Sequence, residues 1–385
     1  EKEPKVWNKK KLILIFSAPV MNILEKIALT KIKGIGPKLS RILLAYNGSV
    51  EEIFRSSKKQ LLAIPTIGEV LAENIVSKSY LQEAEDEYNF TQKHGIEIAW
   101  IEDKNYPKRL KNCDDAPILL YYKGAASLNP TRAISIVGTR NSTSYGKRIC
   151  EEFIQQLKPY DVQVISGLAY GIDSFAHRES LKNQIPTIGI LGHGLDRIYP
   201  SAHRELASRM LENGGLLTEF PSGTNPDRQN FPMRNRIIAG LADVTIVVEA
   251  ALKGGALITA EIANTYNRDV CAFPGGIDQE YSAGCNYLIK TNRAHLIRNT
   301  DDLAYLMNWE KEDKNKTSKQ LKLIPENMTK DEKKVHDHIK LNGQASIDDI
   351  SLYCDWPQSK LAIVLLEMEM KSLIVSLPGK TYKLI

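Results

Sequence analysis

The fold class is decided by Ala133-Ile134-Ser135-Ile136-Val137 and the Gly138-Thr139-Arg140 that follows. The first five residues form a short, β-rich apolar run, and the next three form a turn that leads into a segment of helical length. The same order returns along the chain, with further apolar runs at residues 162–165, 187–191, 216–220, 244–248 and 270–273. Buried strands that alternate with helices are typical of a parallel sheet with helices on both faces. We therefore predict an α/β core with a Rossmann-like, doubly wound and mostly parallel sheet.

In such a sheet a ligand binds beyond the carboxyl ends of the strands, so the loops after the strands form the candidate site. After the first run, Gly138, Thr139 and Arg140 form a small turn, and a helix begins near Lys147. We expect this turn to be an anion nest in which Arg140 offers a planar fork to phosphate. After the second run come Ser166 and Gly167, and this loop either contacts the ligand or only shapes the site.

The third feature is a cluster of arginines around an aromatic residue at the start of a helix. Arginines neutralise phosphates, and an aromatic ring such as Phe231 offers a face to an unstacked base. The alternative is that Phe231 is a core residue and the arginines pair with acids; two arginines two residues apart diverge on a helix, so one is expected to be structural. A further glycine turn follows the fifth run. These two features contribute Arg228, Phe231, Arg234, Asn235, Arg236, Lys253, Gly254 and Gly255.

Several classes of protein are disfavoured. No Gly-x-Gly-x-x-Gly or phosphate-loop motif occurs, which argues against a nucleotide cofactor. His177, His193 and His203 match neither a ligand spacing nor a nucleophile–base pair, so we predict no metal and no catalysis. The five cysteines are scattered and odd in number, which favours a reducing cytoplasm. No apolar stretch reaches the ~18 residues of a membrane span. With 51 Lys and Arg against 46 Asp and Glu, a polyanionic partner must be bound through local clustering.

In order, the motifs are Val137-Gly138-Thr139-Arg140, Ser166-Gly167-Leu168-Ala169, Tyr199-Pro200, Phe231-Pro232-Met233-Arg234-Asn235-Arg236, Leu257-Ile258-Thr259-Ala260 and Phe273-Pro274-Gly275. This series resembles the DNA-processing protein A (DprA, or Smf) family over residues 95–306. The resemblance implies a bacterial homodimer that binds single-stranded DNA and loads the RecA recombinase onto it during natural transformation, without being an enzyme. It also implies that Arg140, Arg228 and Phe231 hold the phosphate-binding and base-stacking positions. Relatives often carry a basic residue where this chain has Ser201, and Arg204 is the expected substitute. They also tend to read Ser-Gly before Leu-Ile-Thr, where this chain has Gly254-Gly255-Ala256.

Two other functions are weighed against this one. Phosphoribohydrolase-type enzymes with a related fold use a Gly-Gly turn followed by a glutamate, which Gly254-Gly255 and Glu261 imitate at a different spacing. A structural adaptor that acts through the end domains would not bind nucleic acid through its core.

The core, residues 95–308, is flanked by smaller parts. We interpret residues 1–20 as a leader outside the fold, with Met21 as the natural start. Residues 21–90 are predicted to form a tandem helix-hairpin-helix (SAM-like) module, in which the second copy has Thr66 where the first has Gly34. This module either contacts DNA or serves only for packing and protein contact, and the sequence does not decide between the two roles. Residues 309–327 are a charged linker. In residues 328–385, helices at 330–341, 347–352 and 358–371 and a hairpin at Pro378-Gly379-Lys380 predict a winged helix. Its third helix carries Glu367 and Glu369, so a protein contact is at least as well supported as reading of a DNA groove.

Overall fold

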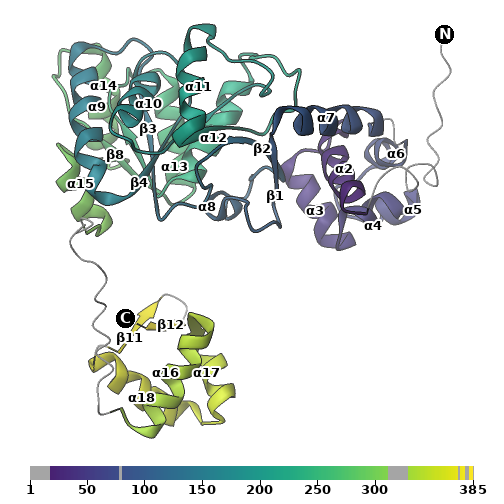
Figure 1. The fold of residues 1–385 in the computed structure, drawn as a ribbon, viewed down its shortest axis with the longest axis vertical. Helices are drawn as coiled ribbons and strands as arrows, with labels where there is room; N and C mark the ends of the chain where they lie inside the picture. The colour runs from purple at the N-terminus through teal and green to yellow at the C-terminus, as the bar shows by residue number, and fades with distance from the viewer. Residues whose placement is uncertain (1–17, 78–79, 311–327, 372, 378–380, 385) are drawn as a thin grey trace. The chain divides into compact units, whose positions relative to one another are not determined.

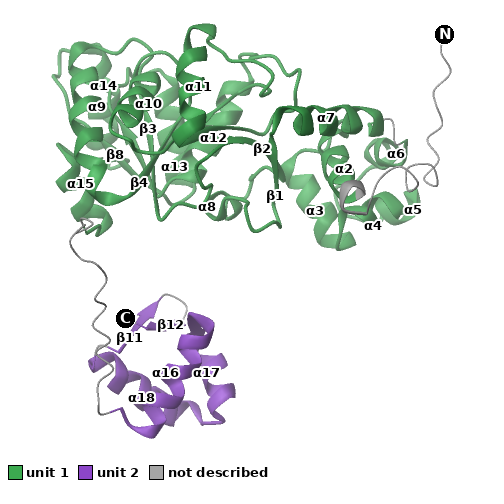
Figure 2. Ribbon diagram, in the orientation of Figure 1, with its two compact units in different colours: residues 1–312 green, residues 313–385 purple. Residues whose placement is uncertain are grey.

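The computed structural model describes residues 18–77, 80–310, 328–371, 373–377 and 381–384, which fall into two compact units (Figure 2). The first unit ends at residue 312, and the second begins at residue 313. Most of the expected leader and linker lies outside the described residues. The first helix already begins at Ala18, three residues before the expected boundary at residue 21. Trp309 still belongs to the first unit, because its ring lies 5.6 Å from the guanidinium of Arg132.

The N-terminal part of the first unit is helical. Its helices are α2 (Ala18–Lys31), α3 (Pro37–Asn47), α4 (Val50–Arg55), α5 (Lys58–Leu62), α6 (Glu69–Ser77) and α7 (Leu81–His94) (Figure 1). The two expected helix–turn–helix copies are α2–α3 and α5–α6. Each turn contains one residue in the left-handed backbone conformation, Gly34 (φ +87°) in the first copy and Thr66 (φ +74°) in the second. The Asn74 side chain donates to the carbonyl of Lys33 (3.0 Å), which ties the second copy to the turn of the first.

Helix α7 attaches this helical part to the sheet. Its buried Glu87 accepts hydrogen bonds from the N–H (2.9 Å) and the hydroxyl (2.7 Å) of Ser222. The Lys31 ammonium lies 3.6 Å from the same carboxylate. Because a buried carboxylate is stable only when it is paired and hydrogen-bonded, this contact fixes α7 on the core.

The core is a nine-stranded sheet in the order β1-β2-β6-β5-β4-β3-β7-β8-β9. Its strands are β1 (Glu97–Trp100), β2 (Leu119–Gly124), β3 (Arg132–Val137), β4 (Val162–Ser166), β5 (Thr187–Ile190), β6 (Gly214–Thr218), β7 (Val244–Val247), β8 (Asp269–Ala272) and β9 (His295–Leu296). From β6 to β9 all neighbours are parallel, whereas β2 joins β6, and β1 joins β2, in the antiparallel sense. The predicted doubly wound, mostly parallel sheet is confirmed, and the six predicted runs are β3 to β8.

Helices cover both faces of this sheet. One face carries α9 (Ser144–Leu157), α10 (Ile172–Lys182), α11 (Arg204–Asn213) and α15 (Thr300–Met307), and the other carries α8 (Lys108–Lys111), α12 (Asn230–Leu241), α13 (Gly255–Thr265) and α14 (Ala283–Lys290). Side chains of β3 alternate between the two. Ile134 and Ile136 pack with Phe153 of α9, while the Ser135 hydroxyl donates to the Ile238 carbonyl of α12 (2.6 Å).

Strands β1, β2 and β9 were not predicted. The β1–β2 pair is antiparallel and lacks a full crossover helix, so the alternation of strand and helix that revealed the other strands is missing there. Strand β9 has only two residues and shows no apolar run.

The second unit has its own core. It contains α16 (Lys330–Asn342), β10 (Gln344–Ser346), α17 (Ile347–Cys354), α18 (Gln358–Met370), β11 (Ile374–Leu377) and β12 (Thr381–Leu384). The three predicted helices are present, and β11 pairs with β12 as expected of the hairpin, whose turn at residues 378–380 lies outside the described residues. The short β10, which was not predicted, adds to the other side of β12. Within the described parts of both units, no helix has the length and apolarity needed to cross a bilayer.

Candidate functional site

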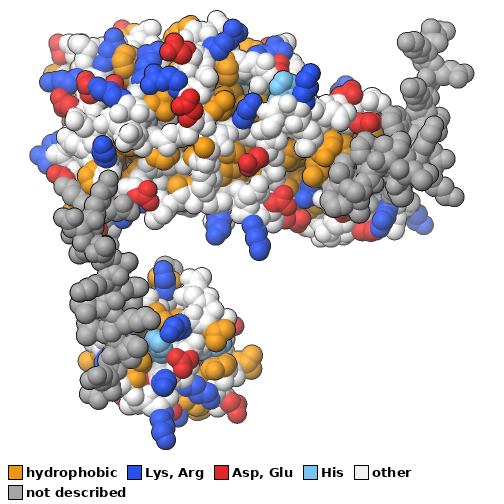
Figure 3. Space-filling view, viewed as in Figure 1, with side chains coloured by type: hydrophobic (Ala, Val, Ile, Leu, Met, Phe, Trp, Pro, Cys, Tyr) orange, Lys and Arg blue, Asp and Glu red, His pale blue; other side chains and the backbone are white. Residues whose placement is uncertain are grey.

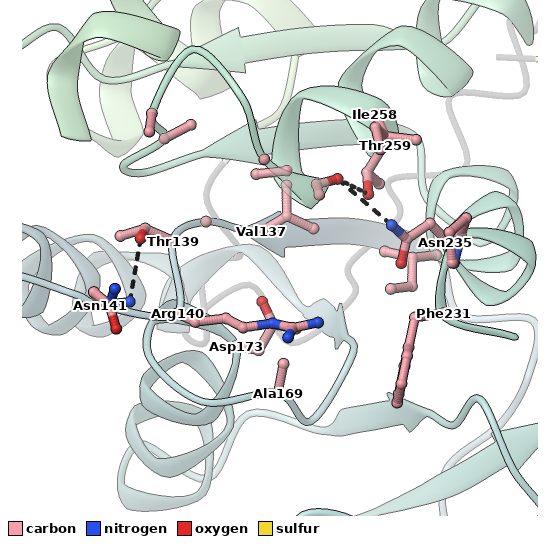
Figure 4. Close-up of a pocket in the computed structure, with 18 of the residues that line it drawn as sticks. Val137, Thr139, Arg140, Asn141, Ala169, Asp173, Phe231, Asn235, Ile258 and Thr259 are labelled. Carbon is pink, nitrogen blue, oxygen red and sulfur yellow. Dashed lines mark hydrogen bonds between the residues drawn. The ribbon is translucent and has the colours of Figure 1, made fainter. Parts of the chain in front are cut away.

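The candidate site lies where the order of the sheet reverses. The chain proceeds outward from β3 through β4, β5 and β6, and then returns to the other side of β3 to form β7. At such a point the loops after neighbouring parallel strands diverge and leave a crevice. A cleft of about 810 Å³ lies here, and all four loops named from the sequence contribute to it (Figure 4). Of the expected residues, those that line it are Gly138, Thr139, Arg140, Arg228, Phe231, Arg234, Asn235, Lys253, Gly254 and Gly255.

Arg140 lies in a loop that is held from two sides. The N–H of Thr139 donates to the carbonyl of Glu249 (2.7 Å), and the Thr139 carbonyl accepts from the N–H of Ile172 (3.1 Å). Gly171, at φ +75°, approaches so closely that a Cβ there would lie 2.2 Å from the Thr139 oxygen. In the described structure no ion pair involves Arg140. Its exposed guanidinium is therefore positioned by the backbone and free to bind an anion.

The Glu249 carboxylate supports the same loop from the interior of the protein. It is buried and accepts hydrogen bonds from the N–H (3.0 Å) and the hydroxyl (2.5 Å) of Thr143, the residue that caps α9. A Cβ on Gly146 would lie 2.0 Å from this carboxylate, so only glycine leaves it room. Glu249 thus positions the loop rather than facing the cleft.

Arg234 was expected to contact DNA, and the structure places it inside the protein instead. Its side chain is only 4% exposed and donates to the carbonyls of Gly167 and Ile190. Burial lowers the pKa of Arg234 to about 10, an effect that the nearby Asp173 opposes. Burial raises the pKa of Asp173. The charge of Arg234 and hydrogen bonds from the backbone of Gly167 and Ala169 oppose this rise. Arg234 and Asp173 therefore hold the loop after β4 and form the floor of the cleft.

Arg236 and Ser166 are also interior residues. Arg236 forms an ion pair with Glu219 and donates to the carbonyl of Asp115. The Ser166 hydroxyl donates to the carbonyl of Ile136 (2.6 Å) and is fully buried. Helix α12 is buried around most of its circumference, so two arginines that diverge on it both point into the protein. Arg236 and Ser166 do not line the cleft, whereas the buried Arg234 does, and the contact of these three residues with DNA stays a prediction.

Phe231 presents an aromatic face in the cleft. Its ring is half-buried and rests on Gly192, where a Cβ would lie 3.1 Å from the ring. The guanidinium groups of Arg140 and Arg234 lie 5.9 Å from the ring centroid. The Tyr199 ring lies 5.9 Å away at a tilt of 37°. Phe231 is thus packed on one side and open to the cleft on the other. Figure 4 shows its ring facing the same space as Arg140.

The first turn of α13 forms the opposite wall. Gly254 is at the N-cap position without a side-chain cap, and Lys253 beside it is exposed. The carbonyl of Gly255 accepts hydrogen bonds from Thr259 (3.1 Å) and from the Asn235 amide (3.5 Å), as the dashed lines in Figure 4 show. Uncapped backbone N–H groups and the positive end of the helix dipole favour an anion here.

The remaining expected residues lie around the cleft. Arg228 is exposed at its rim. Lys147 lines a neighbouring hollow that shares Arg140 with the cleft, and Gly167 packs under the guanidinium of Arg234. Arg204 is exposed on α11 but does not line the cleft, so its role as substitute for a basic residue at position 201 stays a prediction.

Sequence reasoning missed several polar lining residues, among them Asn141, Tyr199, Glu280 and Tyr281. Tyr199 is half-exposed beside Phe231, and Asn141 donates from its amide to the hydroxyl of Tyr281 (3.2 Å). In the sequence, Tyr199 is part of the Tyr199-Pro200 motif, and an aromatic residue before proline in a loop is the signal that indicates it. Nothing in the local sequence indicates that Tyr281, far along the chain, returns to the first loop.

The three histidines that the sequence brought into question lie away from the cleft. His177, His193 and His203 are buried, and none lines the cleft. His177 Nδ1 lies 2.7 Å from the hydroxyl of Thr187, and burial lowers its pKa to about 3. Over the described ranges, no group of three His, Cys, Asp or Glu side chains could hold a metal ion. The exposed cations around the cleft instead suit a polyanion.

Comparison with known proteins gives a consistent result. The model of the family described as DNA recombination-mediator protein A matches residues 97–308, and that of the SAM-like helix-hairpin-helix tandem matches residues 26–78. Protein Smf of Synechocystis is 35% identical over 287 residues, which cover 73% of this chain and 71% of that protein. The X-ray structure of DprA from Streptococcus pneumoniae is similar with a TM-score of 0.65 and 32% identity, over 74% of this chain and 98% of that one. The structure of DprA from Helicobacter pylori, described for its single-stranded DNA binding mode, is similar with a TM-score of 0.51 and 27% identity, over 56% and 97%.

Proposed function

Because this chain belongs to the DNA recombination-mediator protein A family, we propose that it binds single-stranded DNA in the cleft and hands the strand to a RecA-type recombinase. The binding is not followed by a reaction. One phosphate lies on the Arg140 fork, a neighbouring phosphate on the N-terminus of α13 and Lys253, and a base stacks on Phe231. Arg228 attracts the backbone at the rim.

One observation carries this proposal: an exposed arginine without an ion pair in the described structure lies 5.9 Å from an accessible aromatic ring. Cations beside aromatic faces are the usual means of holding a single strand without reading its sequence. The Helicobacter pylori relative, whose structure is described for binding single-stranded DNA, supports the same assignment. Because the expected contacts go to phosphates and to the face of a base, we expect little sequence preference.

The handover to a recombinase, the role in natural transformation and the homodimer rest on membership of the family. A location in the reducing cytoplasm, where such a recombinase works, is supported by the five cysteines, which are all free thiols inside the protein.

A nucleotide-cleaving enzyme is the second candidate, and the position of Glu261 argues against it. Its carboxylate forms an ion pair with Arg293 (2.5 Å) and does not line the cleft. A general acid or base must lie within hydrogen-bonding reach of the substrate. Release of free base from a nucleoside monophosphate by the purified protein would support the enzyme.

The test measures fluorescence anisotropy of a labelled oligothymidylate and of a duplex at several salt concentrations. We expect a strong preference for the single strand, and a salt slope that falls by about 0.7 in Arg140→Ala, together with a loss of affinity. Arg298→Ala is the matched control, because it removes an equal charge from an arginine already paired with Asp302 (3.0 Å). Equal binding of duplex, or an Arg140→Ala variant that binds like the control, would refute the proposed site.

A further inference from the structure

A second hollow of about 620 Å³ adjoins the cleft and shares Arg140 and Asn141 with it. Its other walls come from the loop after β4, the first turns of α10, Lys147 on α9, and Ala202 with His203 just before α11. Lys and Arg side chains gather over this part of the large unit, where α9, α10 and α11 lie (Figure 3). Cleft and hollow therefore meet at Arg140 and have the same charge character.

Two basic side chains at the hollow pack against an aromatic ring but form no ion pair in the described structure. Lys147 and Arg178 are exposed, and both lie over the ring of Phe175, at 5.2 Å and 5.6 Å from its centroid. No ion pair involves either residue in the described structure. Lys182, one turn further along α10, differs in this respect, because its ammonium lies 2.8 Å from Glu151 and 3.2 Å from Glu179. Of these three residues, Lys147 and Arg178 are free to bind an anion in the described structure, and Lys182 is not.

An aromatic platform lies beside these cations. Tyr170 is 51% exposed, and its ring packs edge-on against that of His203 at 5.0 Å and 66°. His203 is buried, and its Nδ1 lies 2.9 Å from the carbonyl of Leu168. The tyrosine ring is therefore held at its edge while much of its surface stays open to solvent. An exposed aromatic ring next to unneutralised cations is the arrangement that stacks a base.

We propose that this hollow is a second binding position for the same single strand, which continues past Arg140 out of the cleft. Arg178 and Lys147 bind the phosphates of the continuing strand, and Tyr170 stacks one of its bases. This inference rests on the proposed function of the cleft. It adds that the footprint on one chain extends beyond the nucleotides held by Phe231, and it names the residues of the extension.

The experiment compares oligothymidylates of about 4 and about 16 nucleotides, the limits of the site sizes that OB-fold proteins show for single strands. Tyr170→Ala and Arg178→Ala are measured against wild type, with Lys182→Ala as the matched control on the same helix. All three positions are at the surface, where substitutions usually change stability by less than about 0.5 kcal/mol. A thermal melt of each variant verifies folding.

We expect both variants to bind the short oligonucleotide like wild type and to bind the long one more weakly, with a loss between about fivefold and 150-fold for the stacking residue in Tyr170→Ala. For Arg178→Ala the salt slope for the long strand falls by about 0.7, and for Tyr170→Ala it does not change. Equal affinity of wild type and variants for the long strand would overturn the second position, as would an equal loss for both lengths. If wild type binds neither strand, or if Arg140→Ala has no effect, it is the proposed function of the cleft that fails.

Discussion

At the scale of single residues, Phe231 and Arg140 are adjacent but are expected to contribute by different physical means. The ring of Phe231 lies on Gly192 and carries no charge, whereas Arg140 lies free at the cleft. Stacking is worth about 1–3 kcal/mol per base and does not depend on release of counterions. We therefore predict that Phe231→Ala lowers the affinity for single strands by this amount at every salt concentration, without changing the salt slope.

Phe231→Tyr is the control for this prediction, since it keeps the aromatic face and should retain most of the affinity. Anisotropy titrations at several salt concentrations give both the affinity and the slope. A Phe231→Ala variant with wild-type affinity would place the bases elsewhere in the cleft.

His177 gives a prediction about pH. Burial is the main reason that its pKa is lowered to about 3, from 6.5 in an unfolded chain. Between these values the unfolded chain binds the proton more readily than the folded one, so the stability from neutral His177 is complete above pH 6.5 and is lost as pH falls toward 3. From about pH 7.5 to 5.0 this residue alone should remove about 2 kcal/mol of unfolding free energy.

Urea unfolding of wild type and of His177→Gln at the two pH values measures this effect. The variant should lose less stability than wild type between them, and the exposed His295→Gln should behave like wild type. Identical losses in all three proteins would show that His177 is not the titrating group.

At the scale of elements, the two helix–turn–helix copies differ at one turn position. Gly34 and Thr66 both have positive φ, at +87° and +74°, but only glycine adopts this conformation without strain. A β-branched residue there is a genuine outlier and costs on the order of 1–2 kcal/mol. Thr66→Gly should relieve that strain, although it adds flexibility to the unfolded chain. We predict a net gain of about 0.5–1 kcal/mol in unfolding free energy.

The matched control is Ala63→Gly, which lies in the same turn at φ −76°. There glycine relieves no strain, so it should lower stability by about 0.5–1 kcal/mol. Denaturant unfolding of both variants measures the difference, and a loss of stability in Thr66→Gly would contradict the strain at this turn.

At the scale of the whole molecule, the sequence predicted the site in part because the sheet is parallel. Once the strands alternate with helices, the loops after β3, β4 and β7 must meet at one edge, and the cleft lies there. What the sequence could not predict was which arginines of residues 228–236 point outward. In the sequence, Arg234 and Arg236 look no different from Arg228. The packing of α12 against the sheet is what buries them. Contacts such as Asn141 with Tyr281 join residues far apart in the chain, and local patterns do not report these.

The division into two units leads to the last prediction. All residues that line the cleft lie between positions 137 and 281, in the first unit, and the second unit has a separate hydrophobic core. On α18 the exposed Ile363, Leu366 and Met370 accompany Glu367 and Glu369, a surface that suits a protein better than a phosphate backbone. A chain that ends at residue 310 should therefore fold and bind a single-stranded oligonucleotide about as tightly as the full chain, because every residue that lines the cleft belongs to the first unit. The same anisotropy titration on both chains measures this. A loss of tenfold or more would mean that the second unit itself holds the strand, and its basic residues, such as Lys360 beside Trp356, would become the next positions to replace.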